Sequence, residues 1–240
     1  RRWNILQQIL VAEYQLYAMP VNDLVYSSDG SYLVASAAYD ANLRVLELST
    51  GSQIALDTNQ GNTSLSWTTT NNGLAVGGSD GYLRIFNGNP LANQLNIEIN
   101  PSGNETSTLL IKQSSDGNRI AVISGREGRY DNAFSVLDMS TGQTQVLIAG
   151  HIGGTTGVAW NETGSQIASI GNDGQIKIWD SYRGNLIYQA GIATLASQSL
   201  SFIDWSNLGQ IAMAISVEDV SGSVIEPMPP LVISADNLSL

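Results

Sequence analysis

The 240-residue chain has no cysteine, one histidine (His151) and two lysines (Lys112 and Lys177). The lack of cysteine excludes disulfides, thiolate catalysis and metal sites that use thiolate ligands. The 10 Lys and Arg residues are outnumbered by 21 Asp and Glu, which gives a formal charge of −11. Nucleic acids and anionic membrane surfaces attract clustered basic residues. We therefore expect neither nucleic acid nor a membrane as a partner.

Long apolar runs are also missing, since none approaches the roughly 18 residues that span a bilayer. The N-terminal RRWNILQQIL is interrupted by Asn4, Gln7 and Gln8 and makes a poor signal peptide. The chain does not begin with Met, so we expect that a leader has been removed or that this is a piece of a longer protein. The compartment stays open between cytoplasmic and extracytoplasmic. With 42% hydrophobic and 13% charged residues, the composition is that of a folded chain.

A repeat with a period near 45 residues organises the sequence. Its landmarks are Tyr26, Trp67, Gln113, Trp160 and Trp205, spaced by 41, 46, 47 and 45 residues. Each landmark opens a polar turn that is followed by a short apolar run, as in YSSDGSYLVAS and WNETGSQIASI. This pattern predicts two strands joined by a tight hairpin.

A second landmark in each repeat is an aspartate that leads a strand of alternating apolar and polar residues. The four segments are DANLRVLE, DGYLRIFN, DNAFSVLD and DGQIKIWD, which begin at Asp40, Asp80, Asp131 and Asp173. The period of two is typical of a β-strand. A glycine turn (Gly51, Gly142, Gly184) then leads into one more short strand. The repeat therefore predicts four strands.

These segments resemble the WD-repeat β-propeller family. The best match is GHIGGTTGVAWNETGSQIASIGNDGQIKIWD, residues 150–180, with its Gly-His pair, Asp-Gly turn and terminal Trp-Asp at Gly150, His151, Asp173, Gly174, Trp179 and Asp180. The other repeats are degenerate. Their Gly-His positions are Leu16-Tyr17, Asp57-Thr58, Gly103-Asn104 and Leu195-Ala196, and their Trp-Asp positions are Leu46-Glu47, Phe86-Asn87 and Leu137-Asp138.

The resemblance implies an all-β propeller of four-stranded antiparallel blades packed radially, because one sheet alone cannot bury both of its faces. We expect about five near-complete blades and a half blade, as part of a larger ring. The expected boundaries are 1–15 (partial), 21–57, 62–99, 105–149, 152–190 and 197–240. An incomplete ring also predicts that the remaining blades of the full-length chain are a partner.

His151, Ser169 and Asp173 form a residue set that can also make a catalytic nucleophile. The resemblance implies a structural role instead, in which Asp173 accepts a hydrogen bond from His151, His151 reaches Ser169, and Ser169 contacts the indole N–H of Trp179. Further repeat-turn positions are Asp40, Asp80, Asp131, Gly150 and Asp180. We expect no catalytic residue, no metal site and no cofactor.

The third repeat is longer between its two landmarks than its neighbours. From Gln113 to Asp131 is 18 residues, against 13 from Trp160 to Asp173. The extension SGREGRYD (124–131) predicts a long loop that places Arg126, Arg129 and Tyr130 on the rim that also carries Tyr39. Arg and Tyr are enriched at binding hot spots. These four residues are the candidate contacts for an acidic protein or peptide, although a merely long, solvated loop is the alternative.

The sequence as a whole predicts a non-enzymatic protein-interaction scaffold that presents a propeller rim. Two alternatives stay open. One is a TolB-like or hydrolase-associated propeller, because SSDGSYLVA and SSDGNRIAV also resemble the Asp-Gly turn of that family. The other is a sensor segment of a larger signalling or effector protein.

Overall fold

The structure is a computed structural model. It describes residues 2–4, 6–37, 40–58, 61–67, 73–87, 91–99, 107–126, 129–192, 198–218, 224–227 and 231–234. These residues form strands and turns without a helix, so this part of the chain contains no helical segment that could span a bilayer.

Five antiparallel sheets of four or more strands follow one another along the chain. The first contains β3 (Val21–Tyr26), β4 (Tyr32–Ala37), β5 (Asn42–Glu47) and β6 (Gln53–Asp57). The second contains β7 (Asn62–Trp67), β8 (Leu74–Gly78), β9 (Tyr82–Asn87) and β10 (Ala92–Glu98). The third contains β11 (Ser107–Gln113), β12 (Arg119–Arg126), β13 (Arg129–Tyr130), β14 (Phe134–Asp138) and β15 (Thr144–Ile148).

The fourth sheet contains β16 (Thr155–Trp160), β17 (Gln166–Gly171), β18 (Gln175–Asp180) and β19 (Leu186–Gly191). The fifth contains β20 (Gln198–Trp205), β21 (Gln210–Glu218), β22 (Val224–Pro227) and β23 (Leu231–Ser234), with β22 and β23 both paired to β21. A separate two-stranded sheet pairs β1 (Arg2–Asn4) with β2 (Ile9–Ala12).

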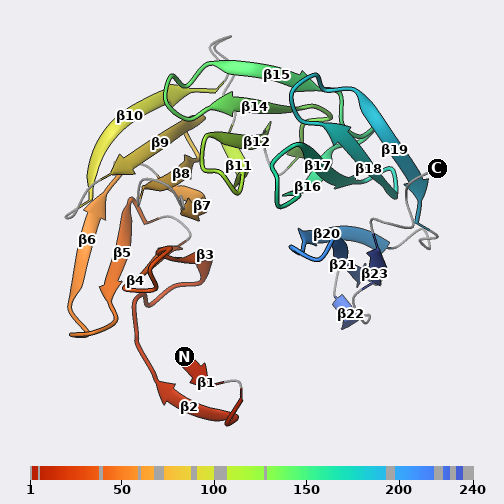
Figure 1. Ribbon diagram of the computed structural model, residues 1–240. Coiled ribbons are helices and arrows are strands. Elements are labelled where there is room, and N and C mark those ends of the chain that lie inside the picture. The colour runs from red at the N-terminus through yellow and green to blue at the C-terminus, as the bar shows by residue number, and fades with distance from the viewer. Residues whose placement is uncertain are drawn as a thin grey trace.

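The sheets are arranged as propeller blades around an axis (Figure 1). The first strands β3, β7, β11, β16 and β20 lie on the inner side of an open arc, and β6, β10, β15 and β19 lie on its outer side. The predicted all-β fold of four-stranded antiparallel blades is therefore confirmed. The β1–β2 sheet lies beside the open end of the first blade.

The repeat landmarks mark the same structural position in every blade. Tyr26, Trp67, Gln113, Trp160 and Trp205 are each the last residue of the innermost strand. The turn that follows contains a glycine with positive φ in the first, third, fourth and fifth blades, for example Gly30 at 71° and Gly164 at 69°. Glycine adopts this conformation at little cost, which explains the tight hairpin.

The hydrophobic core lies between the blades rather than within any one of them. One buried cluster joins each neighbouring pair, and the cluster between the third and fourth blades contains Phe134, Ile148, Trp160 and Trp179. The second, third and fourth blades each contribute an apolar layer to both neighbouring blades. The packing of successive blades therefore provides the burial that a single sheet cannot achieve.

The innermost strand of every blade contains a β-bulge at one repeat position. The pairing register shifts across the residue four positions before each landmark, at Asn22, Thr63, Leu109, Thr156 and Ser201. A bulge adds an unpaired residue and redirects its neighbours. The residues that follow the bulges come from five blades and line the axis of the molecule.

Candidate functional site: a buried polar network and the rim beside it

The four predicted tetrad residues lie in contact within the fourth blade. His151 Nδ1 is 2.7 Å from Asp173 Oδ1, and His151 Nε2 is 2.7 Å from Ser169 Oγ. The indole N–H of Trp179 donates to Ser169 Oγ at 2.8 Å. His151 lies on the connection from β15 to β16 and Asp173 on the turn from β17 to β18, so the network joins two connections to the middle of the blade.

Burial lowers the pKa of His151 below 6.5, although the hydrogen bond to Asp173 opposes that shift. The imidazole is therefore neutral at pH 7. With its proton on Nδ1, it donates to Asp173 and accepts the Ser169 hydroxyl proton at Nε2. Ser169 Oγ in turn accepts from the indole N–H of Trp179, so each member of this hydrogen-bond network has a partner.

The Ser169–His151–Asp173 hydrogen bonds follow the order found in hydrolytic triads. Access differs, because Ser169 is 0% exposed and His151 is 2% exposed. A nucleophile must touch its substrate, and this hydroxyl is enclosed. The arrangement is chemically suited to holding β17, β18 and the preceding connection together, rather than to acyl transfer.

Asp173 is the most connected residue of the network. Burial raises its pKa, but hydrogen bonds from His151 and Lys177 outweigh that effect and hold the pKa below 3.8. Its carboxylate also accepts the backbone N–H groups of Ile152 and Gln175. Lys177 Nζ bridges Asp173 Oδ2 at 3.2 Å and the carbonyl of Gly150 at 2.7 Å.

Gly150 has no room for a side chain, because a Cβ there would overlap Thr155 Oγ1 and the carbonyl oxygen of Asn132. The close approach joins the fourth blade to the third, since His151 N–H donates to the same carbonyl at 2.9 Å. The glycine before the histidine is therefore required by packing between blades.

A family model described as "WD domain, G-beta repeat" matches residues 10–46 and 142–180. The second match contains the complete network of the fourth blade, from Gly150 to Asp180. The chain carries WD repeats. Each match begins in or just before the outermost strand of one sheet, β2 or β15, and ends in the third strand of the next, β5 or β18. Each matched sequence repeat therefore contains the last strand of one sheet and the first three strands of the next.

Two curated relatives are similar to most of this WD-repeat chain. WD repeat-containing protein 1 of Gallus gallus is 26% identical over 197 residues, which cover 75% of this chain and 30% of the relative. WD repeat-containing protein 1 of Rattus norvegicus is 26% identical over 189 residues, with the same coverage. The chain thus aligns with about 30% of the length of the curated relatives it matches.

In the first WD repeat, Tyr17 takes the place of the histidine. Its hydroxyl oxygen is 2.8 Å from the carbonyl oxygens of both Ala35 and Asn42, and it accepts the N–H of Arg44 at 3.0 Å. Burial raises the pKa of Tyr17 to about 12. Ala35 pairs with Arg44 as Ser169 pairs with Lys177. The Tyr17 hydroxyl therefore contacts β4 and β5 of the first blade at the positions that Ser169 and Lys177 occupy in β17 and β18 of the fourth blade.

The second repeat of the sequence, which lies between the two matched segments, keeps only part of the network. Thr58 stands at the histidine position, and its N–H and hydroxyl both donate to the carbonyl of Ala41 in the preceding blade. Asp80 pairs instead with Arg84, which is 8% exposed. A basic residue four positions after the aspartate recurs as Arg44, Arg84 and Lys177. That spacing is visible in the sequence and could have indicated these ion pairs.

The remaining repeat-turn residues act locally. Asp40 Oδ1 accepts the N–H of Asn42 at 2.8 Å, and Asp180 Oδ1 accepts those of Tyr182 and Arg183, both at 2.9 Å. Asp131 is exposed, and its carbonyl accepts the N–H of Thr155 at 2.9 Å. The Gly-His positions of the third and fifth repeats lie outside the described residues.

The extension of the third repeat is a hairpin, whereas the sequence predicted a loop. β13 pairs with the end of β12, with Gly125 opposite Tyr130 and Arg126 opposite Arg129. The polar and glycine residues of SGREGRYD obscured the pairing, since they break the apolar alternation that predicts strands. Arg126, Arg129 and Tyr130 are exposed on this hairpin. Tyr39 lies outside the described residues.

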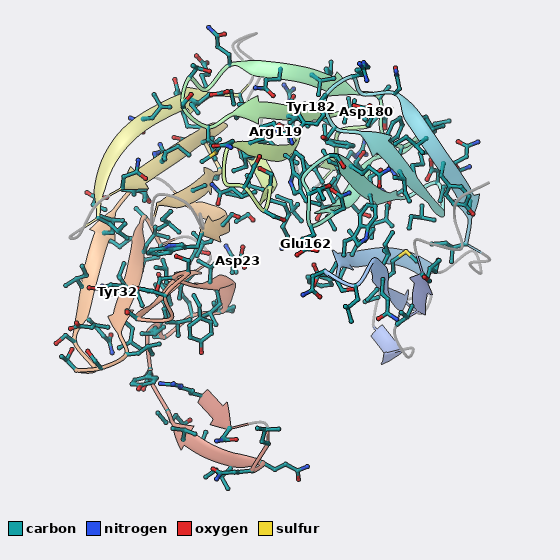
Figure 2. All side chains as sticks on the ribbon, in the orientation of Figure 1. Asp23, Tyr32, Arg119, Glu162, Asp180 and Tyr182 are labelled. Atoms are coloured by element: carbon teal, nitrogen blue, oxygen red, sulfur yellow. The ribbon has the colours of Figure 1, made fainter. Side chains whose placement is uncertain are left out.

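Sequence reasoning missed Arg119, a buried arginine between the third and fourth blades (Figure 2). It donates to Ser181 Oγ at 2.9 Å and to the carbonyl of Gly164 at 2.6 Å. Its guanidinium stacks 4.0 Å from the ring centre of Tyr182 and 5.0 Å from that of Trp160. Its partners are 45 and 62 residues away, so no local pattern could reveal them. The described residues hold no acidic or histidine cluster suited to a metal ion.

Proposed function

We propose that this chain is a non-enzymatic protein-interaction scaffold whose rim of β12–β13 hairpin and neighbouring connections binds a protein partner. WD-repeat proteins generally act as protein-interaction scaffolds, and rigid scaffolds present their binding residues on connections. The observation that carries the proposal is the β12–β13 hairpin, because strand pairing fixes the direction of its side chains. A pre-ordered surface loses less conformational entropy on binding.

The chemistry of this rim favours an acidic partner. Arg126 and Arg129 are exposed, and neither forms an ion pair with the described carboxylates. Tyr130 is 37% exposed, and Ile152 on the next connection is 79% exposed. Tyr130 packs over Gly154, where a Cβ would lie 2.8 Å from its carbonyl oxygen. The surface thus combines two guanidinium groups with adjacent apolar area.

A pull-down comparison tests the proposal. The triple variant Arg126→Ala, Arg129→Ala and Tyr130→Ala is compared with a control, Arg183→Ala and Leu208→Ala, whose 76% and 77% exposed side chains lie on turns at the opposite rim. Partners retained by the parent and the control but lost by the triple variant support the rim. Identical partner sets for all three proteins contradict it.

The alternative of a TolB-like or hydrolase-associated propeller rests on the SSDG turns, and their side chains serve the turns themselves. Ser27 Oγ donates to Asp29 Oδ1 at 2.6 Å and accepts the N–H of Tyr32. Ser114 and Asp116 repeat the arrangement. These residues need no ligand to explain their presence, so the SSDG turns give that alternative no separate support.

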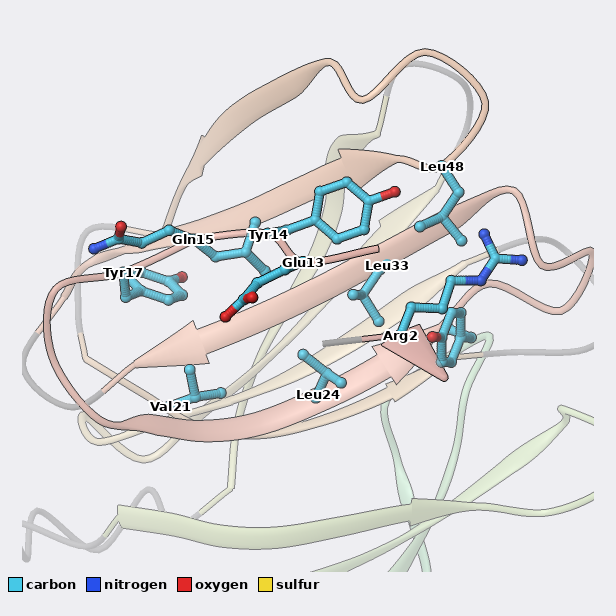
Figure 3. A pocket seen from close by; sticks show the side chains of 11 residues that line it. Arg2, Glu13, Tyr14, Gln15, Tyr17, Val21, Leu24, Leu33 and Leu48 are labelled. Atoms are coloured by element: carbon cyan, nitrogen blue, oxygen red, sulfur yellow. The ribbon is translucent and has the colours of Figure 1, made fainter. Parts of the chain in front are cut away.

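A second proposed contact is with further blades of a longer chain. On the open face of the first blade, Leu24 and Tyr26 are 49% and 47% exposed, whereas Leu65 and Trp67 at the same positions of the second blade are 4% and 9% exposed. A groove of about 480 Å³ follows this face between β3 and residues 13–17 (Figure 3). An apolar blade face of this kind is suited to another sheet.

A further inference from the structure

One repeat position carries a different residue in every blade and faces the axis. The residue three positions before each landmark directly follows the bulge, and the five are Asp23, Ser64, Leu110, Gly157 and Phe202. All five line one cavity of about 220 Å³. Lys112 and Tyr130 also line it. Because they occupy equivalent positions in successive blades, the five converge from five sheets on one space.

The polar side of this cavity is already satisfied within the protein. Asp23 Oδ2 accepts the N–H of Leu65 at 2.7 Å and the hydroxyl of Ser64 at 3.2 Å. Ser64 Oγ in turn accepts the N–H of Ile111 at 3.3 Å. These bonds tie the first three blades together, and Figure 2 shows Asp23 at the inner side of the arc. The Asp23 carboxylate is therefore already used in hydrogen bonds between the first and second blades.

The other side of the cavity has unused binding capacity. Phe202 is 73% exposed although it lies on an innermost strand, and Leu110 is partly exposed. Lys112 is exposed and has no ion pair with the described carboxylates. Gly157 adds no side chain to this wall, where a Cβ would lie 3.1 Å from the side chains of Ile170 and Ile203. An apolar surface beside one free ammonium group fits a ligand that is both apolar and anionic.

We propose that this cavity binds one large apolar side chain of an acidic peptide whose neighbouring carboxylates contact the rim. The volume of about 220 Å³ lies below the roughly 300–1,000 Å³ of pockets that enclose whole small molecules, so it suits a single side chain. Tyr130 belongs both to the cavity wall and to the hairpin that carries Arg126 and Arg129. Lys112 lines the cavity, and Arg126 and Arg129 lie on the hairpin that carries Tyr130, so three of the 10 basic residues of a chain with charge −11 belong to these two neighbouring features. The inference rests on the proposed function and adds to it a site for one apolar side chain of the partner, here called the anchor.

The test uses two fluorescein-labelled synthetic peptides. Both are short and rich in glutamate, and they differ only in a single central residue, phenylalanine or serine. Fluorescence anisotropy measures the Kd of each for the parent, Lys112→Gln, Phe202→Ser, the double variant Arg126→Ala with Arg129→Ala, and the control Leu208→Ser. The substituted side chains are all exposed, so the variants are expected to fold, and their melting temperatures check this.

We expect the phenylalanine peptide to bind the parent about tenfold more tightly than the serine peptide. Phe202→Ser should remove that difference, Lys112→Gln should weaken the phenylalanine peptide by about tenfold, and Leu208→Ser should change neither Kd. The double arginine variant should weaken both peptides. Equal affinity of the two peptides, insensitivity to Phe202→Ser and Lys112→Gln, or no binding overturns the anchor. If only the double arginine variant is without effect, the rim proposal fails instead.

Discussion

At the scale of single residues, the fourth blade shows how one histidine can be used as a structural group. His151 is neutral, enclosed and hydrogen-bonded at both ring nitrogens. A buried polar network stabilises a fold only when each member has a partner, because an unpaired buried donor costs more than a hydrogen bond gains. Removing one member should therefore destabilise the blade by more than the loss of a single contact.

Replacing Asp173 with Ala is expected to lower the free energy of unfolding by about 2–4 kcal/mol, because it leaves the His151 N–H without its acceptor and the Lys177 ammonium with only the Gly150 carbonyl. Asp131 leads the corresponding turn of the third blade but is exposed, so Asp131→Ala should cost less than about 0.5 kcal/mol. Urea denaturation of both variants measures the difference. Equal midpoints for the two would show that the network contributes nothing.

Acid should weaken the same network. The folded state holds the pKa of His151 below 6.5, so the unfolded state takes up the proton first as the pH falls. Stability is fully present above pH 6.5 and is lost as the pH falls toward the folded-state pKa. Thermal melts of the parent and of His151→Gln between pH 8 and pH 5 test this. A parent slope no steeper than that of His151→Gln would contradict the expectation.

At the scale of elements, the sequence predicted what is periodic and missed what is not. The landmarks at Tyr26 and Trp160 end the innermost strands, and the strands led by Asp80 and Asp173 lie where alternation placed them. The β13 hairpin and the bulges were not foreseen, because their residues carry no apolar rhythm. The order of contacts at the tetrad came from the family resemblance and not from spacing.

Arg119 joins two elements that local sequence cannot connect. We expect Arg119→Met to lower the free energy of unfolding by about 2–4 kcal/mol, because two charge-assisted hydrogen bonds and two ring contacts between the third and fourth blades are lost. The control Arg183→Met removes a side chain that is 76% exposed and should change stability by less than about 0.5 kcal/mol. Calorimetric melting measures both. An unchanged melting temperature for Arg119→Met would contradict the claim that Arg119 stabilises the contact between the third and fourth blades.

At the scale of the whole molecule, stability comes from the junctions between blades. Each described junction has a buried cluster, whereas the open face of the first blade exposes the residues that a junction would bury. Exposed apolar faces and strand edges promote association. We therefore expect the 240-residue chain to be less soluble or less stable alone than within a longer protein that covers this face.

Two equivalent leucines measure this effect. Leu65→Ala should cost about 2–4 kcal/mol, because it leaves a cavity at a closed junction. Leu24→Ala should cost less than about 1 kcal/mol in this chain, where Leu24 is 49% exposed. In a longer protein that covers the face, the cost of Leu24→Ala should rise to that of Leu65→Ala. An equally small cost of Leu24→Ala in both proteins would contradict the proposal that another blade packs there.

The most direct test of the account is an NMR titration of the ring nitrogens of His151, which gives an unambiguous signal because it is the only histidine. We predict a neutral imidazole with its proton on Nδ1 and a pKa below 6.5, because burial outweighs the hydrogen bond to Asp173. An imidazole that titrates at 6.5 or above, or that carries its neutral-state proton on Nε2, would contradict the claim that this side chain is an internal structural link of a WD-repeat propeller.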